Sequence, residues 1–226
     1  MVKERAGVNW RRARTGLRAD SRRGMVAAMD TPELTDERAA AILAAAFQAD
    51  PMMRFIAPDD RPRARLLEPL FASSVRHARR SGGGVVGFVE AAVTWLPWTR
   101  IHLSLWDMLC SGMGVLPFLA TPAALLRLAR HDDAALAVVA PVAGKGDDVA
   151  YLWQIGVDPS CQGKGHGGRL LHQVFEVMAP RFPRCILRTE QERNVPFYEK
   201  HGFRCLKREA VAVSQLEVWV FERPLR

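Results

Sequence analysis

A glycine-rich stretch around Lys164 is the part of the sequence whose residue types and spacing could do chemistry. Four glycines occupy the six positions from Gly163 to Gly168, and Lys164 lies among them. Glycine has no Cβ atom to hold a ligand away from the backbone, and it permits positive φ angles. The lysine adds a mobile positive charge. We therefore predict that the stretch binds a phosphate or pyrophosphate, with a loop that merely connects two elements as the alternative.

The elements on either side of the loop place it at the start of a helix. The apolar, aromatic and β-branched run Tyr151–Val157 predicts a buried strand. Asp158-Pro159-Ser160 ends this strand, because proline cannot continue a hydrogen-bonded ladder. The first amides of the following helix lack intrahelical partners and the helix dipole is positive there, which suits an anion. The apolar stripe that predicts this helix consists of Leu170, Leu171, Val174, Phe175 and Met178.

Two common phosphate-binding loops fit this pattern poorly. A P-loop needs Ser or Thr after its lysine, whereas Gly165 follows Lys164. Gly163, Gly165 and Gly168 do match the spacing of a dinucleotide fingerprint, and Glu190 lies at a suitable distance to reach a ribose. However, five residues separate the strand from Gly163. Only 36 residues follow Glu190, which is too few to complete a doubly wound sheet.

A third kind of loop matches in two independent segments. Gln162-x-x-Gly165-x-Gly167, preceded by Val157-Asp158-Pro159, resembles the acetyl-CoA pyrophosphate loop of the GNAT superfamily of N-acetyltransferases. Further along, Arg193–Phe203 is similar to the family's segment with an asparagine, a tyrosine and a Gly-Phe pair. Trp95-Leu96-Pro97 is similar to the end of a strand in some bacterial members. Residues 149–224 carry most of the resemblance, and residues 31–148 fit in the order of their elements.

The resemblance implies an α/β fold with a mixed (α+β) central sheet, flanked by helices, in which two middle strands splay apart. These strands are Tyr151–Val157 and Arg184–Thr189. It further implies that the pantetheine arm of acetyl-CoA lies along the first strand and the pyrophosphate on the loop amides. Gly156 in mid-strand also indicates a bulge or a close backbone approach. The residues expected to bind acetyl-CoA are Ile155, Gly156, Val157, Gln162, Gly163, Lys164, Gly165, His166, Gly167 and Asn194.

Tyr198 is the residue that the resemblance assigns to catalysis. The departing thiolate of CoA needs a proton, and a phenol at this place could supply it as a general acid. The alternative is an aromatic side chain that only packs. Asn194 either contacts the cofactor or caps the short helix that begins beside Pro196.

The general base is harder to identify, because the attacking nitrogen must also lose a proton. Many family members use a carboxylate on the central strand, but residues 151–157 contain none. Glu190 and the pair Asp147 and Asp148 are the remaining candidates, and each is expected to be solvated rather than catalytic. No spacing suited to a metal appears. The histidines near the loop are expected to be exposed bystanders: His166, His172 and His201.

The rest of the chain predicts a single domain over residues 30–226, preceded by a disordered basic extension over residues 1–29. Thr31-Pro32-Glu33 has the signature of a helix start. A second helix is predicted through Leu66–Val75, with Pro69 as a potential kink. Val85–Val89 and Ala91–Leu96 predict a hairpin around Glu90. A helical insertion is expected at about residues 99–146, best defined at 103–113 and 123–130, and strands close the chain at 203–213 and 216–221.

Composition limits the classes of function. The chain carries a net charge of +8, but its first 24 residues hold eight basic and two acidic side chains, so the remainder is nearly neutral. A nearly neutral body argues against a nucleic-acid-binding face. No apolar stretch is long enough to span a bilayer. The four cysteines are widely spaced, which predicts reduced, mostly buried thiols in a cytoplasmic protein: Cys110, Cys161, Cys185 and Cys205.

These expectations amount to an acetyl-CoA-dependent N-acetyltransferase that transfers acetyl directly to a primary amine. The alternative is a regulatory module that binds acetyl-CoA without turnover. A small-molecule amine is the expected partner, shaped by residues 47–60 and 95–146, whose apolar helices indicate a partly apolar acceptor. A protein amine and a homodimer stay open, and neither nucleic acid nor membrane is expected.

Overall fold

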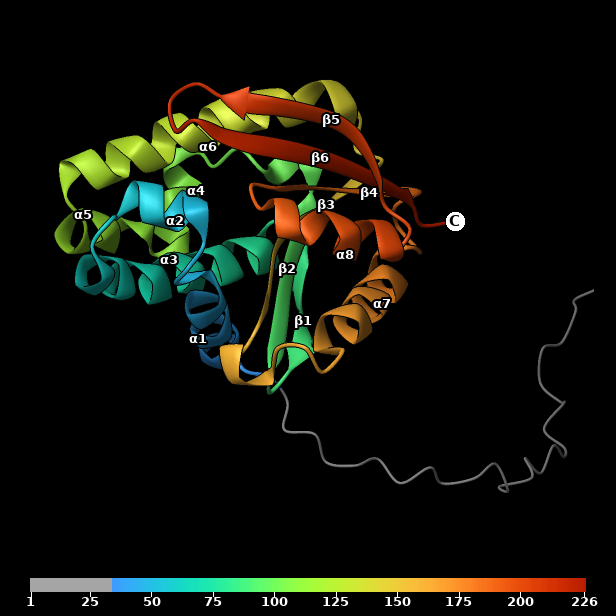
Figure 1. Ribbon diagram of the computed structural model, residues 1–226, viewed down its shortest axis with the longest axis horizontal. Helices are drawn as coiled ribbons and strands as arrows, with labels where there is room; N and C mark the ends of the chain where they lie inside the picture. The colour runs from blue at the N-terminus through green and yellow to red at the C-terminus, as the bar shows by residue number, and fades with distance from the viewer. Residues whose placement is uncertain (1–33) are drawn as a thin grey trace, which may run out of the picture. The chain divides into compact units, whose positions relative to one another are not determined.

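A computed structural model describes residues 34–226 of the chain. The predicted extension over residues 1–29 and the helix start at Thr31–Glu33 lie outside these residues. The described part is built on a six-stranded sheet with strand order β1-β2-β3-β4-β6-β5 (Figure 1). The strands are β1 (Gly84–Phe88), β2 (Ala91–Pro97), β3 (Val149–Val157), β4 (Arg184–Thr189), β5 (Arg204–Val211) and β6 (Leu216–Pro224).

The sheet is mixed, because β3 and β4 run parallel while the other neighbouring pairs are antiparallel. The predicted mixed sheet with flanking helices is therefore confirmed. The dinucleotide-binding alternative is wrong, since a doubly wound fold needs a mostly parallel sheet. The hairpin predicted around Glu90 is the β1–β2 pair, and the strand predicted over Arg184–Thr189 has those same bounds in β4.

Helices cover both faces of the sheet (Figure 1). On one face, α7 (His166–Met178) and α8 (Val195–Lys200) pack on inward side chains such as Val93, Trp95 and Leu187. On the other, α1 (Asp36–Phe47) and α3 (Asp60–Arg80) pack beside Ala92. The long helix α6 (Pro122–Ala143) covers the part formed by β4 and β6. Side chains of one strand alternate between the two faces, so a single strand serves both cores.

Helix α1 begins at Asp36. Its N-cap is Thr35, whose hydroxyl accepts a hydrogen bond from the Arg38 amide at 3.1 Å. Asp36 and Glu37 then place negative charge in the first turn, where the helix dipole favours it.

The chain between β2 and β3 is helical, with α4 (Leu105–Ser111) and α5 (Leu116–Leu119) preceding α6. Helix α6 runs well beyond residue 130, where the prediction ended, with Pro141 in its last turn. Large apolar side chains on α4 and α5 are exposed, Leu105 by 80% and Phe118 by 86%. Others from the same segment, such as Leu116, are buried. The segment is therefore apolar on its inner and its outer side.

Short helix α2 (Pro51–Ile56) was not predicted. Pro51 occupies the first turn of α2, where a missing amide hydrogen is tolerated. Across residues 34–226, no helix combines the length and apolar character needed to cross a membrane. The same residues contain no group of three or more side chains arranged to hold a metal ion.

Candidate functional site

The site begins where β3 and β4 separate. The two strands pair at only three positions, from Val149 opposite Arg184 to Tyr151 opposite Ile186. Beyond Tyr151, β3 continues to pair with β2 on its other side. Within the described residues, the edge of β3 that faces β4 therefore has no strand partner from residue 152 to 157. Such an edge presents amide and carbonyl groups that an extended ligand can pair with.

A β-bulge in β3 accompanies the separation. Thr94 of β2 lies opposite Gln154 and Trp95 opposite Leu152, so Trp153 is the extra residue. A bulge increases the local twist of a strand, which helps β3 turn away from β4. The bulge predicted as one option at Gly156 is not there. Gly156 instead permits a close approach of α1.

A Cβ atom at Gly156 would lie 2.8 Å from the Ala46 Cβ and 3.2 Å from a methyl carbon of Leu43. Real side chains do not pack at the first of these distances, so glycine lets α1 lie directly against the end of β3. Of the two features predicted at Gly156, the structure contains the close approach of another segment.

The glycine loop is open at two positions. Gly163 and Gly165 have φ angles of 77° and 84°, and a Cβ atom at either would meet nothing within 4 Å. Gly165 is the N-cap of α7, and no side chain caps the first amides of this helix. Free amides at a helix start, with no Cβ in front of them, form a cradle for an anion.

The remaining glycines of the loop pack against α8. A Cβ atom at Gly167 would lie 3.2 Å from the ring of Phe197, and one at Gly168 would lie 2.6 Å from His201. These two glycines thus allow α7 and α8 to pack closely. The Lys164 ammonium donates to the Ser160 carbonyl at 3.3 Å.

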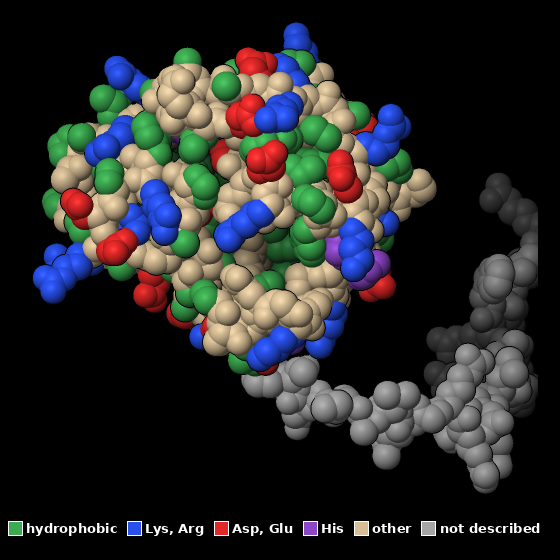
Figure 2. Space-filling model, in the orientation of Figure 1, with side chains coloured by type: hydrophobic (Ala, Val, Ile, Leu, Met, Phe, Trp, Pro, Cys, Tyr) green, Lys and Arg blue, Asp and Glu red, His purple; other side chains and the backbone are tan. Residues whose placement is uncertain are grey.

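One pocket of about 1280 Å³ connects these features and opens on the face shown in Figure 2. We call its two parts the loop half and the helical half. Of the ten residues expected to bind acetyl-CoA, nine line this pocket, and Lys164 does not. The loop half is lined by Ile155, Gly156, Val157, Gln162, Gly163, Gly165, His166, Gly167 and Asn194. The helical half is lined by Phe47, Asp50, Met52, Met53, Leu70, Phe71, Met108, Met113, Leu116, Leu125, Leu128 and Leu136.

Tyr198 lines the pocket from α8 and is 5% exposed. Its ring packs against Phe197, Phe203 and Phe221. Burial, together with the negative charges of Glu190 and Asp50, raises the pKa of the phenol well above its usual range. The hydroxyl therefore keeps its proton at neutral pH and can act only as a donor of it.

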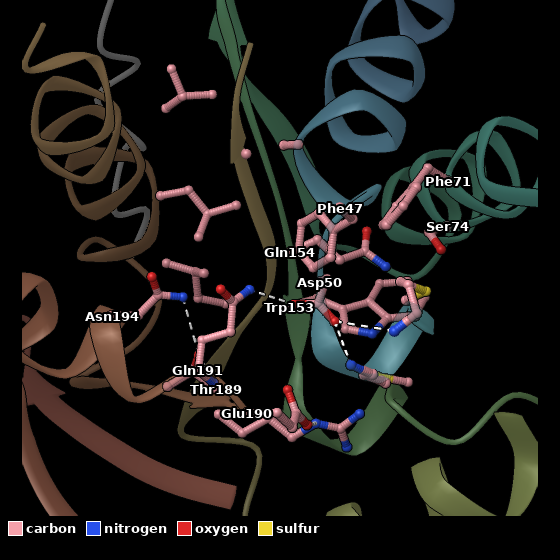
Figure 3. A pocket seen from close by; sticks show the side chains of 18 of the residues that line it. Phe47, Asp50, Phe71, Ser74, Trp153, Gln154, Thr189, Glu190, Gln191 and Asn194 are labelled. Atoms are coloured by element: carbon pink, nitrogen blue, oxygen red, sulfur yellow. Dashed lines mark hydrogen bonds and ion pairs between the residues drawn. The ribbon is translucent and has the colours of Figure 1, made fainter. Parts of the chain in front are cut away.

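Asn194 does not cap α8 through its side chain. Its amide instead donates to the Thr189 hydroxyl at 3.3 Å, across the end of β4 (Figure 3). Asn194 thus occupies the N-cap position of α8 without a capping hydrogen bond from its side chain, and it also lines the pocket. The histidines expected to be exposed bystanders also line the pocket, and of the three only His172 is exposed.

Glu190 is not solvated, contrary to the prediction from the sequence. Its carboxylate lies 3.1 Å from Nε of Arg188 and 3.5 Å from Nε2 of His131. Burial alone would raise the pKa of Glu190, but the Arg188 charge and the His131 contact outweigh burial and lower the pKa. Arg188 also contacts Asp132 at 2.5 Å. Glu190 is thus committed to a buried ion-pair network.

The other two candidates for the base lie away from the pocket. Asp147 and Asp148 are exposed, and neither lines it. Asp148 contacts Nε of Arg184 at 3.1 Å, and its hydrogen bond from this side chain lowers the pKa of Asp148. All four cysteines are free, but only Cys185 is buried and Cys205 is exposed, so the prediction of mostly buried thiols is wrong.

Asp50 is the pocket carboxylate that sequence reasoning missed. It is 5% exposed and caps α2, accepting from the amides of Met52 and Met53 at 2.9 and 3.3 Å. Gln191 donates to its other oxygen at 2.6 Å. Burial, and next the charge of Glu190, raises the pKa of Asp50 to about 6. The Asp-Pro pair is the signal that was available, because Asp before Pro is typical of the start of a helix.

Comparison with known proteins agrees with this geometry. The family profile described as "Acetyltransferase (GNAT) domain" matches residues 124–205, which span α6 to the start of β5. Glucosamine 6-phosphate N-acetyltransferase from Trypanosoma brucei brucei is 33% identical over 64 residues. That match covers 28% of this chain and 44% of the relative, so the chain spans less than half of that protein's length.

A crystal structure covers more of the fold. The structure titled "histone acetyltransferase HPA2 and related acetyltransferase" from Corynebacterium glutamicum superposes with a TM-score of 0.56 at 16% identity. The superposition covers 84% of this chain and 90% of that one. The mixed sheet with its two splayed strands defines the class of fold as α/β, and the superposed structure shares it. Residues 124–205 thus match the GNAT acetyltransferase domain, within a chain that shares its fold with the superposed structure.

Proposed function

We propose that the protein is an acetyl-CoA-dependent N-acetyltransferase that transfers the acetyl group directly to a primary amine. One observation carries the proposal: the unpaired edge of β3 and the open amides at the start of α7 border the same pocket. A ligand with an extended amide arm and a pyrophosphate matches both features at once. The apolar helical half leaves room for an acceptor beside them.

Acetyl-CoA, when bound, supplies an acetyl group activated as a thioester. The backbone groups of Ile155–Val157 would pair with the amide arm, as an added strand pairs with a sheet edge. The amides around Gly165 would bind the pyrophosphate. Tyr198 would hold a proton on its hydroxyl for the departing sulfur.

The proposal is tested first by calorimetry with acetyl-CoA and then by CoA release with a panel of amines. We expect heat of binding and an amine-dependent release. The alternative, a module that binds without turnover, rests on the absence of a carboxylate from residues 151–157. It predicts the same heat with no release for any amine offered.

Tyr198→Phe is expected to lower kcat by roughly a hundredfold or more, the scale of a lost general acid, while the Kd for acetyl-CoA stays unchanged. The hydroxyl is removed but the packed ring remains. Tyr151→Phe is the matched control, because Tyr151 is buried and does not line the pocket. Equal rates for Tyr198→Phe and the wild type would remove the assignment of the acid.

A further inference from the structure

We propose that the helical half of the pocket takes a primary amine carried on an apolar body, and that the Asp50 carboxylate holds its ammonium group. This inference rests on the proposed function and adds the class of acceptor and the residue that recognises it. Three observations support it: the lining of the helical half, the balance of charge within the pocket, and the way Asp50 is held.

The lining of the helical half is mostly apolar and partly aromatic, with Ser74 and Gln154 among its polar side chains. Phe47 and Phe71 have ring centroids 5.0 Å apart, and Trp153 lies on the β3 side of the same space (Figure 3). Methionine and leucine side chains from α2, α3 and the insertion complete the wall. An alkyl or aryl body would bury its surface against these side chains, whereas a sugar would leave several of its hydroxyls facing apolar groups.

The pocket carries more negative than positive charge at this end. Asp132 and Glu190 share the guanidinium of Arg188. Among residues 34–226, Asp50 has no lysine, arginine or histidine within ion-pair distance of its carboxylate. Burying a carboxylate without a cation costs free energy, and a ligand ammonium would neutralise its charge.

The Asp50 carboxylate is held in one orientation and can still accept a further hydrogen bond. Two backbone amides and the Gln191 amide occupy three of the roughly four acceptor positions of an ionised carboxylate. The Gln191 carbonyl in turn accepts from Nε of Arg193 at 2.6 Å, which fixes its NH₂ group toward Asp50. One acceptor position therefore remains for a ligand N–H.

Capping alone does not account for a charge at this position. Helices α1, α4 and α6 are capped by the hydroxyls of Thr35, Ser104 and Thr121, without a buried charge. A neutral side chain would cap α2 as well. Asp50 is instead a carboxylate that is almost fully buried beside a second carboxylate, Glu190.

The acetyl transfer balances with these groups. The ammonium gives one proton to Asp50, which later releases it to solvent. The freed amine nitrogen forms a bond to the acetyl carbon as the carbon–sulfur bond of the thioester breaks, and the sulfur takes the proton of the Tyr198 hydroxyl. The second proton, which the nitrogen loses as the amide forms, restores the Tyr198 hydroxyl through solvent. No oxidant, reductant or metal is needed.

The first test needs no variant. With acetyl-CoA at saturation, phenethylamine and hexylamine should be better substrates, judged by kcat/KM, than spermidine and glucosamine 6-phosphate. Along a series of alkylamines, each added methylene should raise kcat/KM up to roughly fourfold until the helical half is filled. The inhibition constant of phenethyl alcohol should be higher than the Kd of phenethylamine, because the alcohol lacks the ammonium group.

Asp50→Asn is the decisive variant, because asparagine keeps the N-cap and removes the charge. We expect its kcat/KM with phenethylamine to fall by roughly tenfold to a hundredfold, the scale of a lost charged hydrogen bond. Inhibition by phenethyl alcohol and the Kd for acetyl-CoA should be unchanged. Asp59→Asn is the matched control: Asp59 caps α3 without a side-chain hydrogen bond and does not line the pocket.

The pH profile provides a readout that a purely structural cap would not change. For the wild type, kcat/KM should fall as the pH drops through about 6, since protonation neutralises Asp50. The groups facing Asp50 are Glu190, Gln191 with Arg193 behind it, and the Tyr198 phenol. Asp50→Asn should lack this acidic limb.

The outcomes separate the inference from the proposed function. If acetyl-CoA gives no heat of binding, the proposed function fails and the inference with it. If acetyl-CoA binds but polar amines are preferred, or if Asp50→Asn matches the wild type in rate and pH profile, the inference alone is overturned. If the variant turns over too slowly to assay, the Kd of phenethylamine is measured by direct titration. A Kd that is higher for Asp50→Asn than for the wild type supports the inference, and an equal Kd overturns it.

Discussion

Arg188→Met is expected to lower the free energy of unfolding by about 3–5 kcal/mol, the usual loss when one partner of a buried ion pair is removed. The side chain of Arg188 is 10% exposed and serves both Asp132 and Glu190. Methionine restores much of the volume but leaves two carboxylates facing each other without a cation. Urea unfolding at neutral pH, with the slope compared between variants, measures the loss.

The control for this prediction is Arg208→Met. Arg208 pairs with Glu217 on the exposed β5–β6 edge, where both side chains are at least 40% exposed. Solvent screens such a pair, so we expect the free energy of unfolding to stay close to that of the wild type. Similar losses in the two variants would mean that the Arg188 network is not a special source of stability.

The deficit of Arg188→Met should shrink in acid. In the wild type the pKa of Glu190 is lowered on folding, so its contribution is present above the unfolded pKa and is lost as pH falls through the folded pKa. In the variant the carboxylates can take up protons and shed their repulsion. A deficit that grows as the pH is lowered would contradict the assignment.

Gly165→Val is expected to weaken acetyl-CoA binding by at least roughly tenfold. A non-glycine residue at this φ of 84° is strained by about 1–2 kcal/mol, and relief of the strain would turn the first amides of α7 away from the cradle. The new side chain would also project into the open space in front of them. Calorimetry with acetyl-CoA measures the change in Kd.

Gly82→Val separates this effect from simple strain. Gly82 has a φ of 77° at the end of α3 and does not line the pocket. The two variants should lose similar stability, but only Gly165→Val should lose affinity for acetyl-CoA. If both bind like the wild type, the amides around Gly165 do not hold the pyrophosphate, and the proposed function loses its main support.

Much of the fold was predictable because its signals are local. The run Tyr151–Val157, the proline that follows it and the apolar stripe behind the glycines each define an element within a dozen residues. The bounds of β4 and the hairpin around Glu90 were also predictable in this way. Eight of the nine expected acetyl-CoA-binding residues that line the pocket lie on a strand, loop and helix that are consecutive in the chain, and the ninth, Asn194, follows β4.

The environment of the charged groups was not predictable. Gln191 meets Asp50 across 141 positions of sequence, and Arg188 meets Asp132 across 56. Whether a carboxylate is solvated, paired with a cation or buried without one depends on its neighbours in space. Here these neighbours are brought together by the packing of α2, α6 and β4. The sequence by itself determined the elements and the loop, since periodicity, proline and glycine act over a few residues. Only the tertiary structure decided that Glu190 is neutralised while Asp50 is left without a cation, because burial and charge pairing depend on distance in space.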